Sequence, residues 1–269
     1  MFPAKKQGTG IKNTCKFEKE IKKRFQDDYK LQKEFLNILR KRELIGKIMG
    51  EPVRDYLIRD YVERKYHPEV IKNINRIWNG RKITKQMEEK LSTWNKENRS
   101  NEEFFLNTIC AWLGEDYLIY LLKQSPEITE KYIVTREGTD AKRRITKATE
   151  TGIGVDIVLV DKKTGEKTYL EVMEDNKNFV RNTNTLDLRW RNGGKQSKFD
   201  DLKKISEKGN KVTIVVLDNW NKGFLFLNIE DVWVVEYRCW NKYWGRYCTK
   251  IGFDFNKHFK KFEQLGIIA

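Results

Sequence analysis

Hydrophobic residues recur at helical spacing along most of residues 17–124, a pattern typical of a run of amphipathic α-helices. Residues 17–48 contain neither Pro nor Gly before Gly46, so a single helix is expected there. Other segments combine this spacing with a Pro or a polar capping residue near the start, and they predict helices around 52–62 and over 68–78, 84–94 and 102–123. Residues 1–100 are therefore predicted to form an N-terminal helical region.

The pattern changes after Pro126, where short apolar runs between polar turns predict β-strands. Runs over 155–160 and 168–173 are joined by a Lys-Lys-Thr-Gly turn and predict a hairpin. Polar residues dominate 136–152 and 174–194, which are interpreted as loops. The remaining apolar segments predict strands over 131–135, 212–217, 224–227 and 232–237, and helices over 195–207 and 256–264. Residues 101–269 are thus predicted to form an α/β domain.

The charge balance indicates a class of partner. The chain has 54 Lys and Arg against 39 Asp and Glu, a net charge of +15 and a pI near 9.5. This excess favours a nucleic acid, because each neutralised phosphate releases condensed counterions. Ribosomal and membrane-surface proteins share such a charge, so it does not identify the polyanion by itself. Hydrophobic residues at 39% exclude a disordered chain.

The cysteines do not favour a zinc site, because none of them forms a CxxC pair and only two histidines accompany them. Cys239 and Cys248 are spaced to face each other across a hairpin. No run of 18 apolar residues occurs, and the first twelve residues lack the apolar core of a signal peptide. A cytoplasmic protein with no membrane partner is expected.

Two acids stand inside the apolar strands of the predicted hairpin. Asp156 begins the first strand, and Glu171 lies near the end of the second. A hairpin brings the start of one strand beside the end of the other, so the two carboxylates are expected to meet. Such a pair suits Mg²⁺, which prefers oxygen ligands and can activate water against a phosphodiester. The alternative is that both acids only touch solvent at strand ends, where acids are common.

The segment Gly-Val-Asp-Ile-Val-Leu (154–159), the short hairpin and Leu-Glu-Val (170–172) resemble the core of the PD-(D/E)XK nuclease superfamily, over about residues 102–217. The superfamily includes type II restriction endonucleases, Holliday-junction resolvases and repair nucleases. The resemblance implies a restriction-endonuclease-like mixed sheet flanked by helices, with Asp156 and Glu171 as metal ligands. Glu103, on the preceding helix, is a candidate further acid, although a capping role with Ser100 is favoured.

One position departs from the family pattern. The usual Lys two residues after the Glu is replaced by Met173, which cannot donate a hydrogen bond to phosphate. Three explanations are open. A Lys elsewhere in the chain takes over the role, the domain binds DNA without cutting it, or the natural Lys has been replaced by Met. On a helix starting at Lys195, this residue lies roughly 20° and Lys198 roughly 40° from the centre of the apolar stripe. Both are candidate catalytic residues, with Lys195 favoured, and solvent exposure of both is the alternative.

Three basic stretches are candidates for binding DNA. Lys142, Arg143 and Arg144 precede the first acid, and Arg189 and Arg191 follow the second. The third stretch, 238–247, alternates cations with aromatic residues. For the loops the alternative is a solvated surface, and for the aromatic stretch it is strand packing with alternate residues in the core.

These observations predict a Mg²⁺-dependent endonuclease acting on double-stranded DNA, most similar to a type II restriction enzyme and acting as a homodimer. A repair or junction-specific nuclease is the alternative among enzymes. A catalytically dead DNA-binding protein of the same fold is the alternative from another class, and Met173 is the residue in its favour. A basic RNA-binding protein is less favoured, because no RNA-recognition signature is present.

Overall fold

The computed structural model describes residues 9–50, 57–95, 99–138, 141–147, 155–175, 178–191, 196–242 and 246–261. The chain divides into two compact units, named here the helical unit and the sheet unit. The helical unit consists of Met1–Asn95, Arg99–Tyr117 and Lys142–Ala148. The sheet unit consists of Lys96–Asn98, Leu118–Ala141 and Thr149–Ala269.

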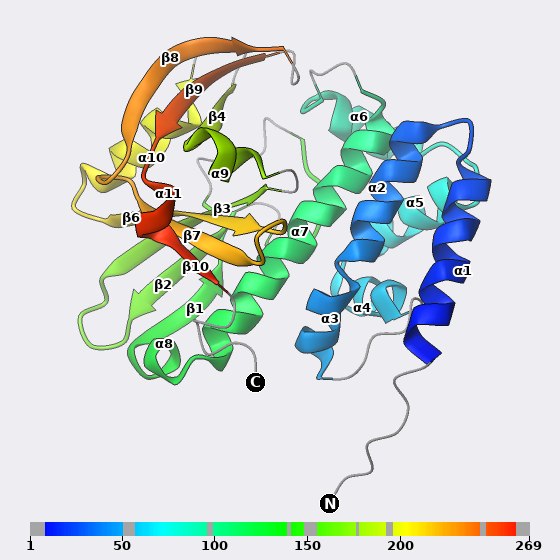
Figure 1. The fold of residues 1–269 in the computed structure, drawn as a ribbon, viewed down its shortest axis with the longest axis horizontal. Helices are drawn as coiled ribbons and strands as arrows, with labels where there is room; N and C mark the ends of the chain where they lie inside the picture. Colours follow the sequence, from blue (N-terminus) through cyan, green and yellow to red (C-terminus); the bar gives the residue numbers. More distant parts are fainter. Residues whose placement is uncertain are drawn as a thin grey trace, which may run out of the picture. The chain divides into compact units, whose positions relative to one another are not determined.

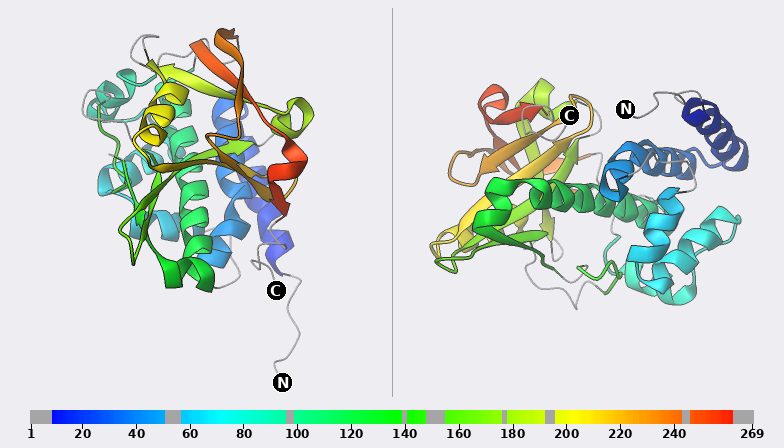
Figure 2. Two further views of the ribbon diagram at one scale, coloured as in Figure 1. Left: turned by 90° about the vertical axis from the view of Figure 1, so that its left-hand side faces the viewer. Right: turned by 90° about the horizontal axis from the view of Figure 1, so that it is seen from below.

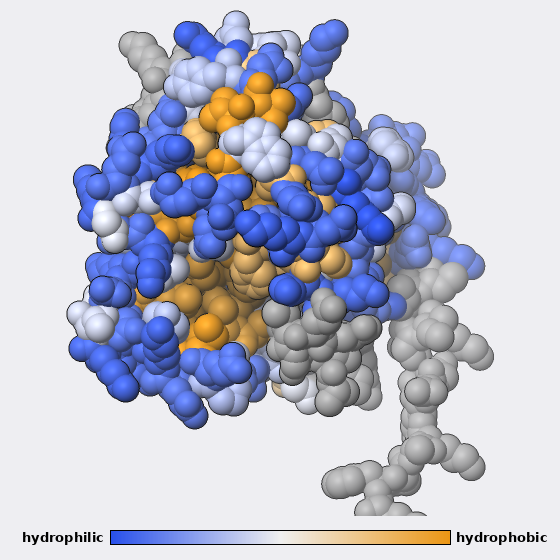
Figure 3. Space-filling view, turned by 60° about the vertical axis from the view of Figure 1, so that its left-hand side comes forward, coloured by the Kyte–Doolittle hydropathy of each residue, from blue (hydrophilic) through white to orange (hydrophobic). Residues whose placement is uncertain are grey.

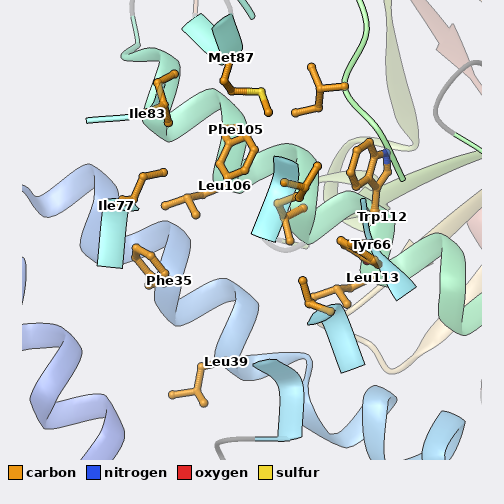
Figure 4. Close-up of a cluster of buried hydrophobic side chains, with 14 of the residues drawn as sticks. Phe35, Leu39, Tyr66, Ile77, Ile83, Met87, Phe105, Leu106, Trp112 and Leu113 are labelled. Atoms are coloured by element: carbon orange, nitrogen blue, oxygen red, sulfur yellow. The ribbon is translucent and has the colours of Figure 1, made fainter. Parts of the chain in front are cut away.

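The helical unit packs around one apolar cluster. Phe105 and Leu106 are fully buried, and Figure 4 shows them among Phe35, Ile77 and Met87. Burial of such large apolar side chains is the main force that stabilises a helical unit of this kind. Its described helices are α1 (Thr9–Arg24), α2 (Tyr29–Arg40), α3 (Arg42–Met49), α4 (Leu57–Lys65), α5 (Pro68–Trp78), α6 (Lys85–Ser92) and the first part of α7 (Asn101–Gln124).

The single helix expected over 17–48 is wrong, because three helices occupy this part of the chain (Figure 1). The chain leaves the helical conformation between α1 and α2. Asp28 caps the start of α2, and its side chain accepts a hydrogen bond from the N–H of Leu31 at 3.0 Å. Lys41 separates α2 from α3 and is itself buried. Neither residue is a strong helix breaker, so the apolar periodicity concealed both bends.

The other helices follow their sequence signals closely. α5 begins at Pro68 and α6 begins after Thr84, whose hydroxyl accepts from the N–H of Met87. Ser100 caps α7 as expected, accepting from the N–H of Glu103 at 3.1 Å. These starts depend on side chains within one turn of the helix, which is why the sequence predicts them.

The sheet unit contains a six-stranded mixed sheet in the order β1-β2-β3-β6-β7-β10. β3 and β6 run parallel, whereas the other neighbours are antiparallel. The strands are β1 (Tyr132–Arg136), β2 (Ile157–Asp161), β3 (Lys167–Asp175), β6 (Lys211–Asp218), β7 (Gly223–Asn228) and β10 (Phe259–Lys261). Together with α7, this sheet confirms the predicted fold class: a mixed sheet flanked by helices, and an N-terminal helical region.

A second, four-stranded sheet in the order β5-β4-β9-β8 stands apart from the first (Figure 1). Its strands are β4 (Thr185–Arg191), β5 (Gln196–Ser197), β8 (Trp233–Asn241) and β9 (Arg246–Gly252). β4 lies in the stretch expected to be a polar loop, where Leu186 and Leu188 alternate with polar residues and are buried. Two buried residues among many polar ones gave too weak an alternation to predict the strand.

Besides the end of α7, the sheet unit contains short helices among its described residues. They are α8 (Pro126–Lys131), α9 (Phe179–Thr183), α10 (Lys198–Ser206) and α11 (Phe255–His258). The helix expected over 256–264 is therefore wrong within the described residues, because β10 follows α11 and pairs with β7. Phe259 starts β10 and stacks on Phe255, so packing overrides the local helical pattern.

The border between the units differs from the expected boundary at residue 100. Helix α7, green in Figure 2, is assigned to the helical unit up to Tyr117 and to the sheet unit from Leu118. Residues 142–148 also belong to the helical unit, although they lie between strands in the sequence. No helix within the described residues combines the length and hydrophobicity needed to cross a bilayer.

Candidate functional site

Asp156 lies immediately before β2 and is held against β3 by two hydrogen bonds. Its N–H donates to the carbonyl of Leu170 at 3.1 Å, and its Oδ2 accepts from the N–H of Val172 at 2.7 Å. These two contacts bracket Glu171 on the neighbouring strand. The hairpin therefore places Asp156 beside the backbone positions that flank Glu171.

Glu171 projects on the face of the sheet that α10 covers. It lies in register with Ile214 of β6, one of the buried residues packed with Phe199 of α10. The carboxylate Oε2 of Glu171 is 2.6 Å from Nζ of Lys198, the first residue of α10. Lys198 is only 5% exposed, so this ion pair is largely shielded from water. An ammonium group buried in this way requires a partner charge.

The sequence analysis favoured Lys195 over Lys198 because of where it placed the start of the helix. It started the helix at Lys195, whereas α10 begins at Lys198 with Ser197 as its cap. Ser197 Oγ accepts from the N–H of Phe199 at 3.2 Å. Moving the start of the helix changes the direction of every side chain in its first turn, and Lys198 points to the sheet. Lys195 lies outside the described residues.

A chain of buried hydroxyl groups fixes the start of α10 to the second sheet. Ser197 Oγ is 3.0 Å from Thr249 Oγ1, which also accepts from Nε1 of Trp190 at 3.0 Å. Ser197 and Thr249 are both fully buried. Because Ser197 directly precedes Lys198, this network holds the backbone from which the Lys198 side chain reaches Glu171.

Met173 lies two residues after Glu171 and on the same face of β3. It is partly buried and packs against the apolar cluster formed by α10 and the sheets. A thioether at this position fills the core and provides no cation. The positive charge expected near the acids is instead provided by Lys198.

Asp156 and Glu171 offer carboxylate oxygens, the ligand type that hard divalent cations prefer. Among the described residues, no cluster of three or more His, Cys, Asp or Glu is arranged to hold a metal. Mg²⁺ commonly binds one or two carboxylates and completes its shell with water and substrate phosphate, so a pair of acids is compatible with such an ion. One oxygen of Glu171 can contact Lys198 while the other faces a cation.

One predicted DNA-binding residue is corrected by the structure. Arg143 is 1% exposed, and its guanidinium group bonds Glu115, Asp116 and the carbonyl of Trp112. Burial lowers the pKa of Arg143, but the adjacent carboxylates raise it more, so the group stays charged. A cation neutralised inside the helical unit cannot bind phosphate.

The other basic candidates are distributed over both units. Lys142 and Arg144 are exposed and belong to the helical unit. Arg189 is exposed on β4, and the side chain of Arg191 lies outside the described part of the chain. Glu103 also belongs to the helical unit, where Ser100 caps its helix and Lys30 lies 3.9 Å away.

The sequence missed the residues that position Lys198. A usable signal was present at Ser197, which is followed three residues later by Asp200, a spacing typical of a helix N-terminus. It would have moved the predicted start of α10 to its observed place. Thr249 had no such signal, because it approaches Ser197 only through the pairing of β4 with β5 and β9.

No family model matches the sequence, and no curated protein matches it. Among solved structures, the chain is similar to Hjc, a Holliday junction resolvase from the archaeal hyperthermophile Archaeoglobus fulgidus. The two chains are 14% identical, and the match covers 58% of this chain and 94% of the resolvase with a TM-score of 0.32. A score of this size does not establish a shared fold, and the assignment of the site rests on its own geometry.

Proposed function

We propose that the chain is a metal-dependent DNA endonuclease of the PD-(D/E)XK type. The observation that supports this most directly is the buried ion pair between Lys198 and Glu171, beside Asp156. Two carboxylates and one ammonium group on adjoining elements match the charges that phosphodiester hydrolysis requires. Met173 was the main argument for a domain that binds DNA without cutting it. Lys198 weakens that argument, because it supplies the cation that Met173 cannot.

Each side chain has a distinct role in this proposal. Asp156 and Glu171 would hold Mg²⁺, and the hydrogen bond from Val172 fixes the orientation of the Asp156 carboxylate. When bound, the ion would activate water and neutralise charge on the attacked phosphate. The three N–H groups of Lys198 can donate to a phosphate oxygen while the pair with Glu171 keeps the side chain in place.

The finer form of the proposal is a type II restriction endonuclease that cuts both strands of duplex DNA as a homodimer. Its support is the pattern of the sequence: a core like that of this superfamily, an added helical region and several basic loops. Sedimentation of the protein with and without duplex DNA tests the dimer, since a monomer in both states would contradict it.

Cleavage of plasmid DNA in the presence and absence of Mg²⁺ tests the activity. Asp156→Ala and Glu171→Ala should each abolish cleavage while leaving folding and DNA binding largely intact. Glu166→Ala is the matched control, because this exposed acid lies in the turn between the same two strands. Binding without cleavage by the unmodified protein would identify a dead DNA-binding module, and normal cleavage by either acid variant would remove that acid from the site.

A further inference from the structure

An exposed aromatic cluster on the second sheet is not used by the proposed hydrolysis. We call it the aromatic platform, and it consists of Trp190, Tyr237, Arg238, Trp240 and Tyr247. Tyr237 and Trp240 are each 54% exposed, and Tyr247 is 40% exposed. The alternative interpretation of the stretch 238–247, aromatic residues packed in the core, is wrong for its described aromatic residues, because Trp240 and Tyr247 are exposed while Cys239 and Asn241 between them are half-buried.

The platform is ordered by contacts among its own side chains. The rings of Trp190 and Tyr237 lie 5.2 Å apart, and those of Trp240 and Tyr247 lie 5.1 Å apart. The guanidinium carbon of Arg238 stands 5.2 Å from the Trp190 ring and 5.1 Å from the Tyr247 ring. A cation held between two rings strengthens the cluster and leaves positive charge within it.

The backbone of β8 is irregular at this point. Arg238 has a φ of 58°, which is uncommon for a residue with a long side chain, and the pairing register shifts between Glu236 and Cys239. Tyr237 is fixed to α10 by a 2.8 Å hydrogen bond from its hydroxyl to Asp200, which also raises the pKa of Tyr237. Such a bulge turns side chains out of the regular alternation of a strand, and here it turns aromatic residues outward.

The platform adjoins the proposed catalytic residues. Trp190 pairs with Ser197, and the hydroxyls of Thr249 and Ser197 join the Trp190 ring to the start of α10, where Lys198 begins. Figure 3 shows hydrophobic surface exposed near the top of the molecule, and the exposed residues of β8 include Val234, Val235 and Tyr237. Large exposed aromatic surfaces are uncommon on proteins that act alone and indicate a binding site.

We propose that the aromatic platform stacks unpaired DNA bases next to the scissile phosphate, an inference that rests on the proposed nuclease function. Aromatic rings stack on any base, and the interleaved Arg238 adds attraction to the phosphate backbone. The net charge of +15 favours this occupant over another protein. The preferred DNA therefore exposes unpaired bases beside the cleavage point in a single-stranded segment, whereas a fully paired duplex offers no base face to the platform.

Fluorescence anisotropy with an oligomer of fifteen thymidines and a paired duplex of equal length, both in EDTA, tests the proposal. Trp240→Ala and Tyr247→Ala should each weaken binding of the thymidine oligomer by roughly 5- to 150-fold, the effect of losing one stacked base. Trp240→Phe should keep most of the affinity, because it keeps an aromatic face. Trp220→Ala is the matched control, since this Trp is 63% exposed in the turn between β6 and β7. Binding of the paired duplex should change little in every variant.

Three results would overturn the platform: unchanged binding of the thymidine oligomer by both alanine variants, an equal loss with Trp220→Ala, or tighter binding of a uridine oligomer. A shift from dimer to monomer in Trp240→Ala with unchanged DNA binding would assign the surface to self-association instead. Because EDTA prevents Mg²⁺-dependent cleavage, the binding measurement tests the platform proposal independently of the nuclease proposal. If the alanine variants lose affinity for the thymidine oligomer but the protein shows no Mg²⁺-dependent cleavage, only the nuclease proposal is contradicted. If the protein cleaves DNA but the alanine variants bind the oligomer normally, only the platform proposal is contradicted.

Discussion

At the scale of single residues, the position of Lys198 has the sharpest functional consequence. Its Nζ lies 2.6 Å from Glu171 and comes from the helix, not from the strand position that Met173 occupies. The geometry places Lys198 at the site, whereas Lys195, which the sequence favoured, lies outside the described residues. It also makes the third charge of the site accessible to a direct test.

Lys198→Ala should reduce Mg²⁺-dependent cleavage by at least ~100-fold, the typical effect of losing one transition-state contact to a charged donor. DNA affinity should fall only slightly, because one phosphate contact among several is lost. Single-turnover cleavage and equilibrium binding measure the two effects. Lys204→Ala, an exposed lysine on the same helix, is the control and should behave like the unmodified protein. Normal cleavage by Lys198→Ala would show that the ion pair is only structural.

Met173→Lys tests whether the site needs a cation or needs Lys198 in particular. Met173 shares a face of β3 with Glu171, so a lysine there can approach the same carboxylate. Introduced into Lys198→Ala, it should restore cleavage by at least ~10-fold, part of what one charged contact contributes. Met173→Leu in the same background should restore nothing. A large gain from Met173→Lys in the unmodified protein would instead indicate that Lys198 does not fill the role.

At the scale of structural elements, the segment 141–147 shows how position in the sequence misleads. Arg143 stands in a basic run, but its guanidinium group forms ion pairs with Glu115 and Asp116 of α7. The hydroxyls of Tyr61 and Tyr66 also donate hydrogen bonds to Asp116. The segment thereby ties itself to the helical unit. Its neighbours Lys142 and Arg144 remain exposed as candidates for phosphate contact.

Arg143→Met should lower the free energy of unfolding by about 3–5 kcal/mol, because it leaves two buried carboxylates without their cation. Urea unfolding followed by far-UV circular dichroism measures the change. Arg144→Met is the matched control, since the adjacent arginine is exposed and should alter stability little. Loss of DNA affinity by folded Arg143→Met, with unchanged stability, would return Arg143 to the DNA-binding set.

At the scale of the whole molecule, the net charge of +15 predicts that the proposed binding of DNA depends strongly on salt. If six to ten phosphates are contacted, the slope of log K against log salt for duplex binding should be roughly −5 to −9. Titrations between low and physiological salt measure this slope. A slope near zero would contradict the electrostatic argument.

The sequence by itself determined the features that depend on neighbouring residues. Helix starts at Pro68, Thr84 and Ser100 follow from side chains within one turn, and the hairpin follows from two apolar runs around a Lys-Lys-Thr-Gly turn. Because strand pairing in a hairpin is local, the position of Asp156 beside the part of β3 that carries Glu171 could also be predicted. The fold class followed from the order of these elements.

Only the tertiary structure decided the features that join distant segments. Thr249 and Ser197 are far apart in the sequence, and their contact exists because β4 pairs with both β5 and β9. The burial of Arg143 depends in the same way on α7. Periodicity reports which face of an element is apolar, but it does not report which element will cover that face. The side chain that accompanies Glu171, and the aromatic residues that stay exposed on β8, were therefore fixed by packing between segments.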